Sequence, residues 1–449
     1  MPKISSIIKN KKVILIIIVI FFIVFVALWN VVSGGYDKQD KTILLLKKFI
    51  PKQISRKVRD TIFIIPDLKE RNKFLSTQVK KFEQGFNGEL FNEEIILTKK
   101  NKKKYSLKEF FLPFPRLDGR LGWSSTKNSK RAHHFAIIKE NVIVISGEGK
   151  TIYFKKNNIL NKKLNQIVIP NNIQSIINEN NSELIGIRDL FLEDEKIYIS
   201  LIFKNLKGLS INVYKADVNF EKLNFELFFE TGEYWDYYNV YSGGRLSTYK
   251  DNKILFTIGY SHVQKAAQQL DSLLGKIISI DKLTGEHKII SMGHRNPQGL
   301  YYVKDSNIII NTEHGPKGGD EINISHAGKN YGWPTISYGK HYSGEKVGEG
   351  THKTGYEQPI YYWDPSIAPS GLLHYRGKAF PAWRKNLFVG ALKSQFLGRL
   401  ELKNGRVIRE ERLFVNELGR IRDVREGPNG HIYFLTDGAD GKLIRISPK

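Results

Sequence analysis

The first hydrophobic pattern in the chain is one long run without polar interruption. Every residue from Val13 to Trp29 is apolar, and no charged residue occurs from Val13 to Tyr36. Such a run is long enough to cross the hydrocarbon layer of a bilayer. Because its apolar positions cover every side of a helix, a buried core helix is a poorer interpretation. We therefore expect residues 1–36 to form a cytoplasmic tip and a transmembrane anchor.

The orientation of this segment follows from the charges in front of it. Lys3, Lys9, Lys11 and Lys12 precede the run, and the positive-inside rule then leaves the N-terminus in the cytoplasm. We expect a single-pass protein of the inner (cytoplasmic) membrane, with the remaining chain on the periplasmic or extracellular side. A cleaved signal peptide is the alternative, but residues 31–34 make a poor cleavage site.

The pattern over residues 37–89 changes to apolar positions spaced among many charges, which predicts a basic helical stalk or linker. From residue 90 to 449 it changes again, into short β-rich runs bounded by Gly, Asn or Asp. Six such runs share one sequence pattern, in which a turn is followed by an aliphatic or aromatic strand, and this pattern recurs at separations of roughly 50 residues. These expected strands are 141–146, 196–201, 253–258, 306–311, 386–390 and 431–436.

A supersecondary unit repeated at this interval favours four-stranded blades arranged around a channel. A β-sandwich does not need repeating units of this length. The pattern thus predicts an all-β propeller of four-stranded antiparallel blades, preceded by the transmembrane helix and the helical stalk; the family resemblance described below sets the expected number of blades at six.

The amino-acid composition excludes some classes of binding site. The 449 residues carry a formal net charge of +25 and contain no cysteine, so thiolate metal sites and disulfides are excluded. Much of the excess charge lies at the start of the chain, since residues 1–60 hold 12 Lys and Arg against 3 Asp and Glu. A solvated basic segment beside a membrane explains this, and we expect no nucleic-acid partner because no reader motif accompanies the charge.

The second half of the chain contains four long motifs, which lie within Gly293–Leu300, Glu313–Pro334, Asp364–Lys393 and Gly419–Gly430. In this order and spacing they resemble the motifs of the soluble-type glucose/sorbosone and aldose sugar dehydrogenase family. The resemblance is close from about residue 243 to 445 and weaker from about 130 to 242. It implies a six-bladed propeller that uses pyrroloquinoline quinone (PQQ) with calcium, oxidises a sugar or other alcohol and passes electrons to an external acceptor.

The resemblance also implies roles for individual residues. Arg295, Arg420 and Arg422 match cofactor-binding arginines, and Lys393 and Asn296 match further cofactor contacts. Guanidinium groups suit this role because PQQ carries three carboxylates. The carbonyls of Gly315 and Pro316 would hold the calcium ion beside PQQ, and a second, structural calcium would take Asp320, Glu321 and the carbonyl of Tyr331.

The chain departs from the family where the chemistry takes place. Tyr241 stands at the position of the family's proton-accepting histidine, and Tyr260 at that of its partner aspartate. The glutamine expected before Leu184–Ile187 is not evident either. A tyrosine that titrates near pH 10 is a poor base, which makes His262 an alternative base and leaves a tyrosinate stabilised by arginines as another.

Two histidines inside the motifs, His294 and His314, are expected to be structural. Three functions remain open at this point: a dehydrogenase with altered specificity, a non-catalytic propeller that binds a quinone, glycan or protein, and an envelope scaffold without a small ligand.

Overall fold

The computed structural model describes one compact unit, which lies within Gln78–Asp118 and Gly122–Lys449. The described residues are 88–89, 105–112, 132–139, 141–154, 163–164, 166–236, 241–437 and 441–449. The expected membrane segment and stalk lie outside them. Of the helices in the described part, none has the length and apolar character to cross a bilayer.

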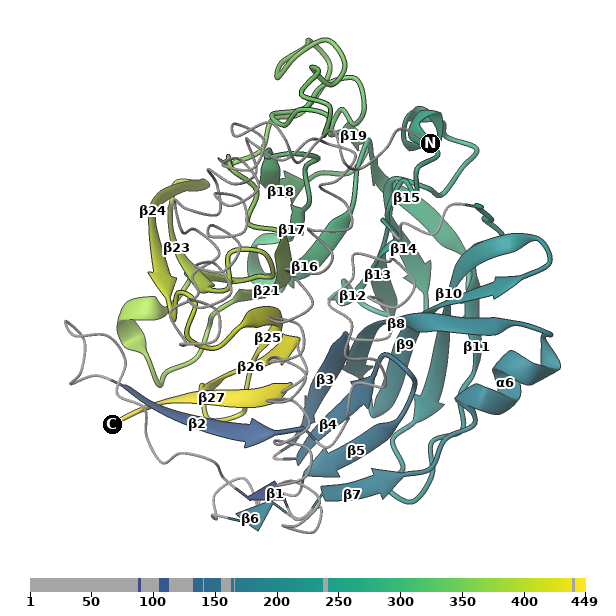
Figure 1. Cartoon of the computed structure of the whole chain (residues 1–449), viewed down its shortest axis with the longest axis vertical. Helices are drawn as coiled ribbons and strands as arrows, with labels where there is room; N and C mark the ends of the chain where they lie inside the picture. The colour runs from purple at the N-terminus through teal and green to yellow at the C-terminus, as the bar shows by residue number, and fades with distance from the viewer. Residues whose placement is uncertain are drawn as a thin grey trace, which may run out of the picture. The chain divides into compact units, whose positions relative to one another are not determined.

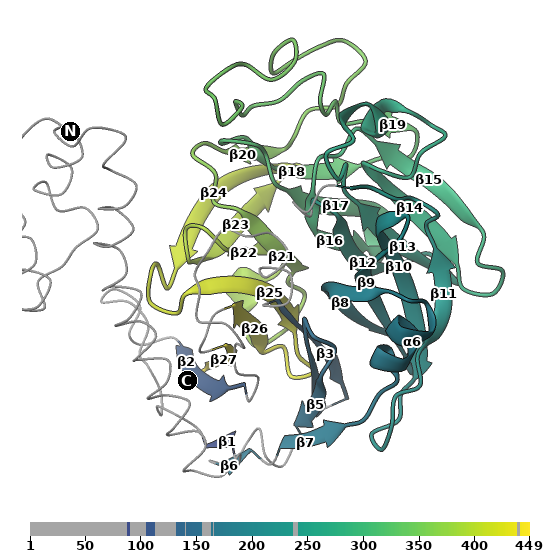
Figure 2. The same cartoon turned by 45° about the vertical axis from the view of Figure 1, so that its right-hand side comes forward.

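Six four-stranded antiparallel units surround a common axis, which confirms the predicted propeller (Figures 1 and 2). The first three blades contain β3 (His133–Ile138), β4 (Asn141–Ser146), β5 (Thr151–Phe154) and β7 (Gln166–Ile169); β8 (Glu183–Glu193), β9 (Lys196–Asn205), β10 (Gly208–Asp217) and β11 (Glu226–Glu230); and β12 (Gly243–Tyr249), β13 (Lys253–Ile258), β14 (Lys276–Asp281) and β15 (His287–Met292).

The next three blades follow the same order from the axis outward. They contain β16 (Pro297–Val303), β17 (Ile308–Glu313), β18 (Asp320–Ser325) and β20 (Tyr361–Trp363); β21 (Pro369–His374), β22 (Leu387–Ala391), β23 (Leu397–Lys403) and β24 (Arg406–Leu413); and β25 (Arg420–Glu426), β26 (Ile432–Asp437), β27 (Lys442–Pro448) and β2 (Tyr105–Phe111).

Short elements complete the described part. β19 (Lys329–Asn330) pairs in parallel with β15, and β1 (Gly88–Glu89) pairs with β6 (Lys163–Leu164). The helix α6 (Ile173–Glu179) joins the first two blades, and a 3₁₀ turn spans Gln264–Gln268.

The last blade is built from both ends of the described chain. β2 pairs with β27 over seven residues, from Tyr105 opposite Pro448 to Phe111 opposite Lys442. The N-terminal strand therefore supplies the outermost strand of the blade whose other three strands are C-terminal, and this pairing closes the ring.

The core lies between blades rather than within them, because the side chains of a strand alternate between the two faces of its sheet. Six hydrophobic clusters each join two neighbouring blades around the ring. Ile143 of β4, for example, shares a cluster with Leu201 of β9, and both side chains are fully buried. The innermost strands are thereby held at fixed positions around the axis.

Candidate active site

The residues that the sequence singled out all lie at one end of the propeller. Arg295, Tyr241 and Arg420 stand at or just before the start of innermost strands. Tyr260 and Lys393 follow second strands, which run antiparallel to the innermost ones and so end on the same side. Alternating strand direction therefore brings segments from four different blades to one face.

Arg295 is held in place by several hydrogen bonds. Its side chain is buried, and its guanidinium donates to the carbonyl oxygens of His314 and Gly315 at 3.0 and 2.8 Å. The backbone N–H of Arg295 donates to Glu313 at 2.7 Å. The Nε atom is buried without a hydrogen-bond partner, so this guanidinium keeps a donor for a further group.

Aromatic rings surround the same guanidinium. Its central carbon lies 4.5 Å from the ring centre of Tyr241, 5.6 Å from that of Tyr260 and 5.1 Å from that of Trp333. The two tyrosine rings stack with 5.7 Å between their centres. Cation–π contacts of this kind favour the charged arginine in a site with little water.

The backbone segments that contain Tyr241 and Tyr260 lie close against each other. Ser261 donates its N–H to the carbonyl of Tyr241 at 3.1 Å. A Cβ atom at Gly259 would lie only 1.9 Å from that carbonyl oxygen, so only glycine fits there. Ser261 and His262 both have positive φ angles, 47° and 65°, a strained conformation that is concentrated at functional sites.

His262 lies beside both tyrosines. Its ring centre is 4.6 Å from that of Tyr241, and its Nδ1 atom lies 3.4 Å from the hydroxyl of Tyr260. Burial, and then the charge of Arg295, lower the pKa of His262 to about 4. Burial raises the pKa of Tyr260 to about 12, although Arg295 acts in the opposite direction. At neutral pH, His262 is thus an unprotonated imidazole and Tyr260 a protonated phenol.

The other predicted cofactor contacts are arranged around the axis. Arg420 and Arg422 both approach Asp437, Arg420 with its Nε at 3.9 Å and Arg422 through a bidentate contact with its Nε at 3.0 Å. Arg420 also donates to the carbonyl of Leu392 at 3.1 Å, and the exposed Lys393 follows. Both arginines thus lie near the same carboxylate.

Arg422 and Arg295 act on one imidazole from different blades. Burial, together with the charges of both arginines, lowers the pKa of His314 to about 4, although Asp320 and the hydrogen bond to Pro369 act in the opposite direction. His314 accepts a hydrogen bond from Asn296 at 3.3 Å and donates to the carbonyl of Pro369 at 2.7 Å. The predicted cofactor residues Arg295 and Asn296 therefore both contact His314, and the charge of Arg422 acts on the same imidazole.

The predicted calcium residues form a tight loop structure. Asp320 is fully buried and accepts four hydrogen bonds, from Gly315 N at 2.9 Å, Ser366 Oγ at 2.7 Å, Ile367 N at 2.7 Å and Ala368 N at 2.8 Å. The carbonyl of Gly315 accepts from Arg295, and Pro316 is buried beside it. In this arrangement Asp320 joins the loops of two blades, and its role as a calcium ligand stays a prediction.

Glu321 and Tyr331 border a small cavity. Its volume is about 20 Å³, and Glu313, Trp333 and Arg295 also line it. Burial, and then the charge of Glu313, raise the pKa of Glu321 to about 8. A carboxyl group whose charge is this unfavourable gains most from a bound cation, and the volume is sufficient for a single ion or water.

His294 has the surroundings of a structural residue. It is fully buried, and its two ring nitrogens contact Glu313 at 2.9 Å and Ser291 at 2.8 Å. Its ring also stacks on Tyr331. This is the role that the sequence suggested for it.

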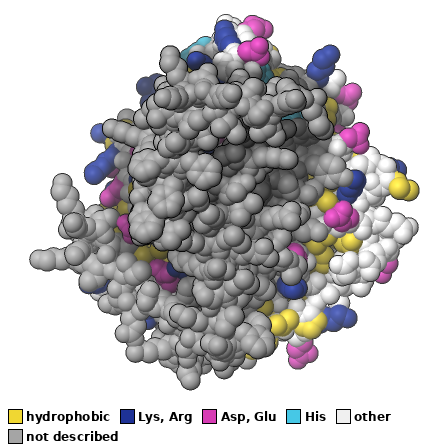
Figure 3. Space-filling view, viewed as in Figure 1, with side chains coloured by type: hydrophobic (Ala, Val, Ile, Leu, Met, Phe, Trp, Pro, Cys, Tyr) yellow, Lys and Arg dark blue, Asp and Glu magenta, His cyan; other side chains and the backbone are white. Residues whose placement is uncertain are grey.

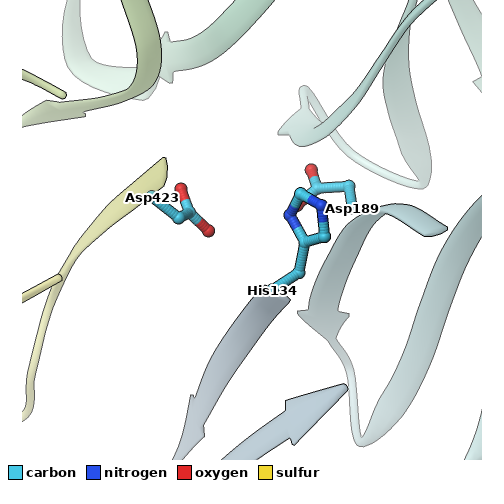
Figure 4. Close-up of side chains that lie close together, drawn as sticks. All are labelled: His134, Asp189 and Asp423. Carbon is cyan, nitrogen blue, oxygen red and sulfur yellow. The ribbon is translucent and has the colours of Figure 1, made fainter. Parts of the chain in front are cut away.

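A buried ionic network in the channel was not expected from the sequence. His134, Asp189 and Asp423 lie together at the axis, on three different blades (Figure 4). Arg425 contacts Asp189 at 2.9 Å and Asp423 at 3.2 Å, and Arg245 contacts the same two carboxylates. Because both carboxylates are paired with arginine, this is an ion-pair network and a poor cation site.

No sequence signal marks this network, since its members are up to 291 positions apart between His134 and Arg425.

On the outer surface, the described basic and acidic side chains are interspersed around the rim of the face seen in Figure 3.

Comparison with known proteins agrees with this architecture. The family model described as glucose/sorbosone dehydrogenase matches residues 132–445. Aldose sugar dehydrogenase YliI of Escherichia coli (strain K12) is 40% identical over 222 residues, which cover 46% of this chain and 60% of the relative. Quinoprotein glucose dehydrogenase B of Acinetobacter calcoaceticus is 26% identical over 285 residues, covering 44% and 59%. The chain thus spans about three fifths of the length of these two relatives.

Two solved structures support the same assignment. A crystal structure of a glucose dehydrogenase has a TM-score of 0.62 and 30% identity, covering 71% of this chain and 96% of its own. The apo-form of the soluble aldose sugar dehydrogenase of Escherichia coli has a TM-score of 0.59 and 29% identity, covering 70% and 96%. With a family match over most of the chain and the same propeller in both structures, this chain belongs to the glucose/sorbosone dehydrogenase family.

Proposed function

We propose that this protein oxidises a sugar or another alcohol, with PQQ as the bound cofactor and calcium as the metal. The observation that carries the proposal is Arg295, a buried guanidinium at the mouth of the channel with a free Nε donor. The names of the relatives, a quinoprotein glucose dehydrogenase and an aldose sugar dehydrogenase, support it.

The donor set fits a flat molecule with three carboxylates. Arg295 and Asn296 contact His314, on which the charge of Arg422 also acts, while Arg420 and Lys393 lie at the outer edge of the same end. Arginine forks and a lysine suit carboxylate groups. When bound, PQQ supplies a two-electron acceptor for alcohol oxidation.

Calcium is proposed for the cavity beside Glu321. A buried carboxyl with a pKa near 8 is poorly stabilised as an anion by the protein alone, and oxygen ligands suit a hard cation. The carbonyl of Tyr331 is the further ligand that we propose at this cavity, and the carbonyls of Gly315 and Pro316 remain the proposed ligands beside the cofactor.

His262 is our proposed proton acceptor. It is neutral at physiological pH, and it lies in contact with Tyr241 and Tyr260, at the end of the channel that also holds Arg295. A neutral imidazole accepts the proton of a substrate hydroxyl far more readily than a phenol does. Tyr260, with its pKa near 12, instead serves as a hydrogen-bond donor and a packing surface.

The full-length protein tests the proposal directly. Purified in detergent, it is titrated with PQQ with and without Ca²⁺, and the loaded protein is offered a panel of aldoses and polyols with an artificial electron acceptor. We expect calcium-dependent uptake and turnover of at least one substrate. Uptake without turnover would favour the alternative, a propeller that binds a quinone, glycan or protein, and no uptake would reject both the cofactor and the reaction.

We also propose that the propeller is held outside the cytoplasmic membrane by residues 1–36, on the strength of the apolar run and the lysines before it. Cell fractionation checks this. The full chain should sediment with membranes, and a chain that starts at residue 37 behind a cleavable secretion signal should not.

A further inference from the structure

The third blade contains a fully buried lysine that none of the sequence motifs includes. Lys276 is the first residue of β14, and its side chain is not exposed to solvent. Its Nζ atom donates to the carbonyl oxygens of Ala266 at 2.8 Å, Ala267 at 3.2 Å and Leu274 at 2.8 Å. Lysine is rarely buried without a partner, and here its partners are three backbone carbonyls.

The number of donors matches the number of acceptors. A lysine ammonium has three N–H groups, one for each of these carbonyls. Burial lowers the pKa of Lys276 to about 8, although the charges of Glu233 and Asp271 act in the opposite direction. The amine is therefore largely protonated at neutral pH and keeps all three donors.

All three carbonyls belong to the connection between β13 and β14. We call this connection, residues 259–275, the His262 loop, because His262 lies near its start. Ala266 and Ala267 are part of its 3₁₀ turn, and Leu274 lies near its end. A Cβ atom at Gly275 would lie 2.5 Å from the Cβ of Ala267, so the loop folds back closely on itself at Lys276.

Consecutive backbone hydrogen bonds connect Lys276 to the proposed base. Ala266, whose carbonyl accepts from the ammonium, donates its own N–H to the carbonyl of Val263 at 3.0 Å. Val263 in turn donates its N–H to the carbonyl of Tyr260 at 2.8 Å. His262 lies inside this last turn, so its position depends on the turn that Lys276 holds.

The same loop is attached to the segment that contains Arg295. The carbonyl of Ala267 accepts a second hydrogen bond, from the N–H of Gly293 at 3.0 Å, and the N–H of His294 donates to the carbonyl of Gly275 at 3.1 Å. Tyr260 donates its N–H to the carbonyl of Arg295 at 2.9 Å. Lys276 therefore stabilises the part of the loop that determines how far His262 lies from Arg295.

The backbone at His262 needs such support. Its φ angle of 65° and that of Ser261, 47°, are unfavourable for residues other than glycine, and strained backbone persists only where its surroundings hold it. Val263 is 41% exposed, so apolar packing contributes little at this point of the turn. Hydrogen bonds must supply most of the restraint.

We propose that Lys276 is a positioning residue of the candidate site, which holds the His262 loop through three hydrogen bonds and so keeps the imidazole of His262 at a fixed distance from Arg295. Lys276 acts through the loop and not by contact with the reacting molecules. The inference deepens the proposed function and rests on it for the reaction that His262 serves.

The test compares the full-length wild type with the variants Lys276→Met, Lys276→Gln and Lys288→Met. Methionine keeps most of the stem but removes the donors, glutamine keeps an amide donor without the charge, and Lys288 is an exposed lysine of β15 in the same blade. The first arm measures amide hydrogen exchange of the protein without PQQ, with peptides from the other blades as the reference. The second arm measures kcat and KM of the protein loaded with PQQ and Ca²⁺.

Loss of the charge-assisted hydrogen bonds in Lys276→Met should accelerate exchange in the His262 loop about tenfold to a hundredfold, without a change in the other blades. Its kcat should fall at least about tenfold, because a small displacement of a catalytic group costs up to about 10²-fold. KM should change by less than about twofold, since the contacts with substrate remain. Lys276→Gln should be intermediate, and Lys288→Met should behave as the wild type does.

Wild-type exchange in the loop of Lys276→Met, or faster exchange there without a loss of kcat, overturns the inference. Faster exchange throughout the propeller with no excess in the loop also overturns it, because Lys276 would then serve only overall stability. If the wild type shows no turnover, the proposed function fails, and the exchange arm still decides whether Lys276 holds the loop. Should Lys276→Met fail to fold, the comparison of Lys276→Gln with the wild type decides by the same criteria.

Discussion

The sequence resemblance predicts that the two tyrosines of the candidate site replace the family's proton acceptor and its partner, and their surroundings suit packing. Tyr260 is 3% exposed, its ring meets Trp333 at 5.2 Å, and burial raises its pKa to about 12. His262 has the opposite property, because the same burial keeps its imidazole unprotonated. In the proposed mechanism the basic group is therefore His262, which follows Tyr241 by 21 positions in the chain.

Replacement of His262 by glutamine tests this assignment. General-base catalysis is worth about 10²–10⁴-fold, so we expect kcat/KM of the PQQ-loaded protein to fall by that factor in His262→Gln. The pKa of His262 is about 4, so this imidazole becomes protonated, and unable to accept a proton, only as the pH falls towards 4. The kcat/KM of the wild type should therefore be constant near neutral pH and decrease towards pH 4. Steady-state kinetics from pH 4 to 8 measure both.

Tyr241→Phe is the matched control for this variant. It removes the hydroxyl and keeps the ring over Arg295, so kcat/KM should change by less than about tenfold if His262 is the base. A large loss in Tyr241→Phe with little loss in His262→Gln would assign the proton to the tyrosine instead.

His374 provides a test of pH-dependent stability away from the site. It is 9% exposed, and burial, then Arg376 and Lys385, lower its pKa to about 4, against about 6.5 in an unfolded chain. The unfolded state therefore binds more protons between pH 4 and 6.5. The stabilisation is fully present above pH 6.5 and is lost as the pH falls towards 4, by at most about 1.4 kcal/mol per pH unit.

We expect His374→Gln to reduce the slope of unfolding free energy against pH in this window. Urea unfolding at several pH values between 4 and 7 measures the slope, and the exposed His352→Gln serves as control. An unchanged slope in His374→Gln would show that this histidine protonates in the folded protein as it does in the unfolded one.

Among the secondary-structure elements, the second strand of each blade was the most predictable. The six strands expected from the sequence correspond to β4, β9, β13, β17, β22 and β26, and β4 and β13 have the expected bounds. These strands lie between two neighbours in their own sheet and between two other blades. Val142, Ile143, Val144 and Ile145 of β4 are all buried, which explains the continuous apolar run that marked them.

The innermost strands were harder to predict because they face a polar channel. Arg188 and Arg422 interrupt their strands at bulges, and Asp189 pairs with arginines more than 50 residues away in the chain. The order of apolar and polar residues along the chain reveals neither where a strand has a bulge nor which distant residue a buried carboxylate pairs with. The candidate site was predictable only where a family motif covered it, and the contact of His262 with both tyrosines required the fold.

The ionic network connects innermost strands, and a substitution at Asp423 tests how much this network contributes to stability. Asp423→Asn keeps the shape of the side chain but leaves Arg245 and Arg425 with one carboxylate, Asp189, between them. Breaking a buried pair of this kind costs about 3–5 kcal/mol, so we expect a loss of that size in the free energy of unfolding. Urea titration followed by tryptophan fluorescence measures it.

An exposed ion pair provides the comparison for Asp423→Asn. Asp305 pairs with Arg376 on the surface, and Asp305→Asn should cost less than about 1 kcal/mol. Equal small losses in both variants would mean that water or a mobile ion compensates the arginines in the channel.

At the scale of the whole molecule, the ring depends on one pairing between sequence-distant strands. β2 and β27 join the first described propeller strand to the last, and without β2 the backbone of β27 would present an unpaired edge to solvent. Leu107 of β2 is fully buried in the cluster between the last two blades, among Phe388, Phe434 and Ile444. Closure is therefore secured by hydrophobic burial as well as by hydrogen bonds.

Leu107→Ala measures how much this closure contributes to stability. Truncating a buried leucine costs about 2–5 kcal/mol, and here the loss should weaken the one blade that the two ends of the described chain build together. The same substitution at Leu206, which is fully exposed in the β9–β10 turn, should change stability by no more than about 0.5 kcal/mol. Both values come from equilibrium unfolding of the full-length protein in urea. If Leu107→Ala were as harmless as Leu206→Ala, the other five blades would hold the ring without β2, and the N-terminal strand would be an attachment to the propeller instead of its closure.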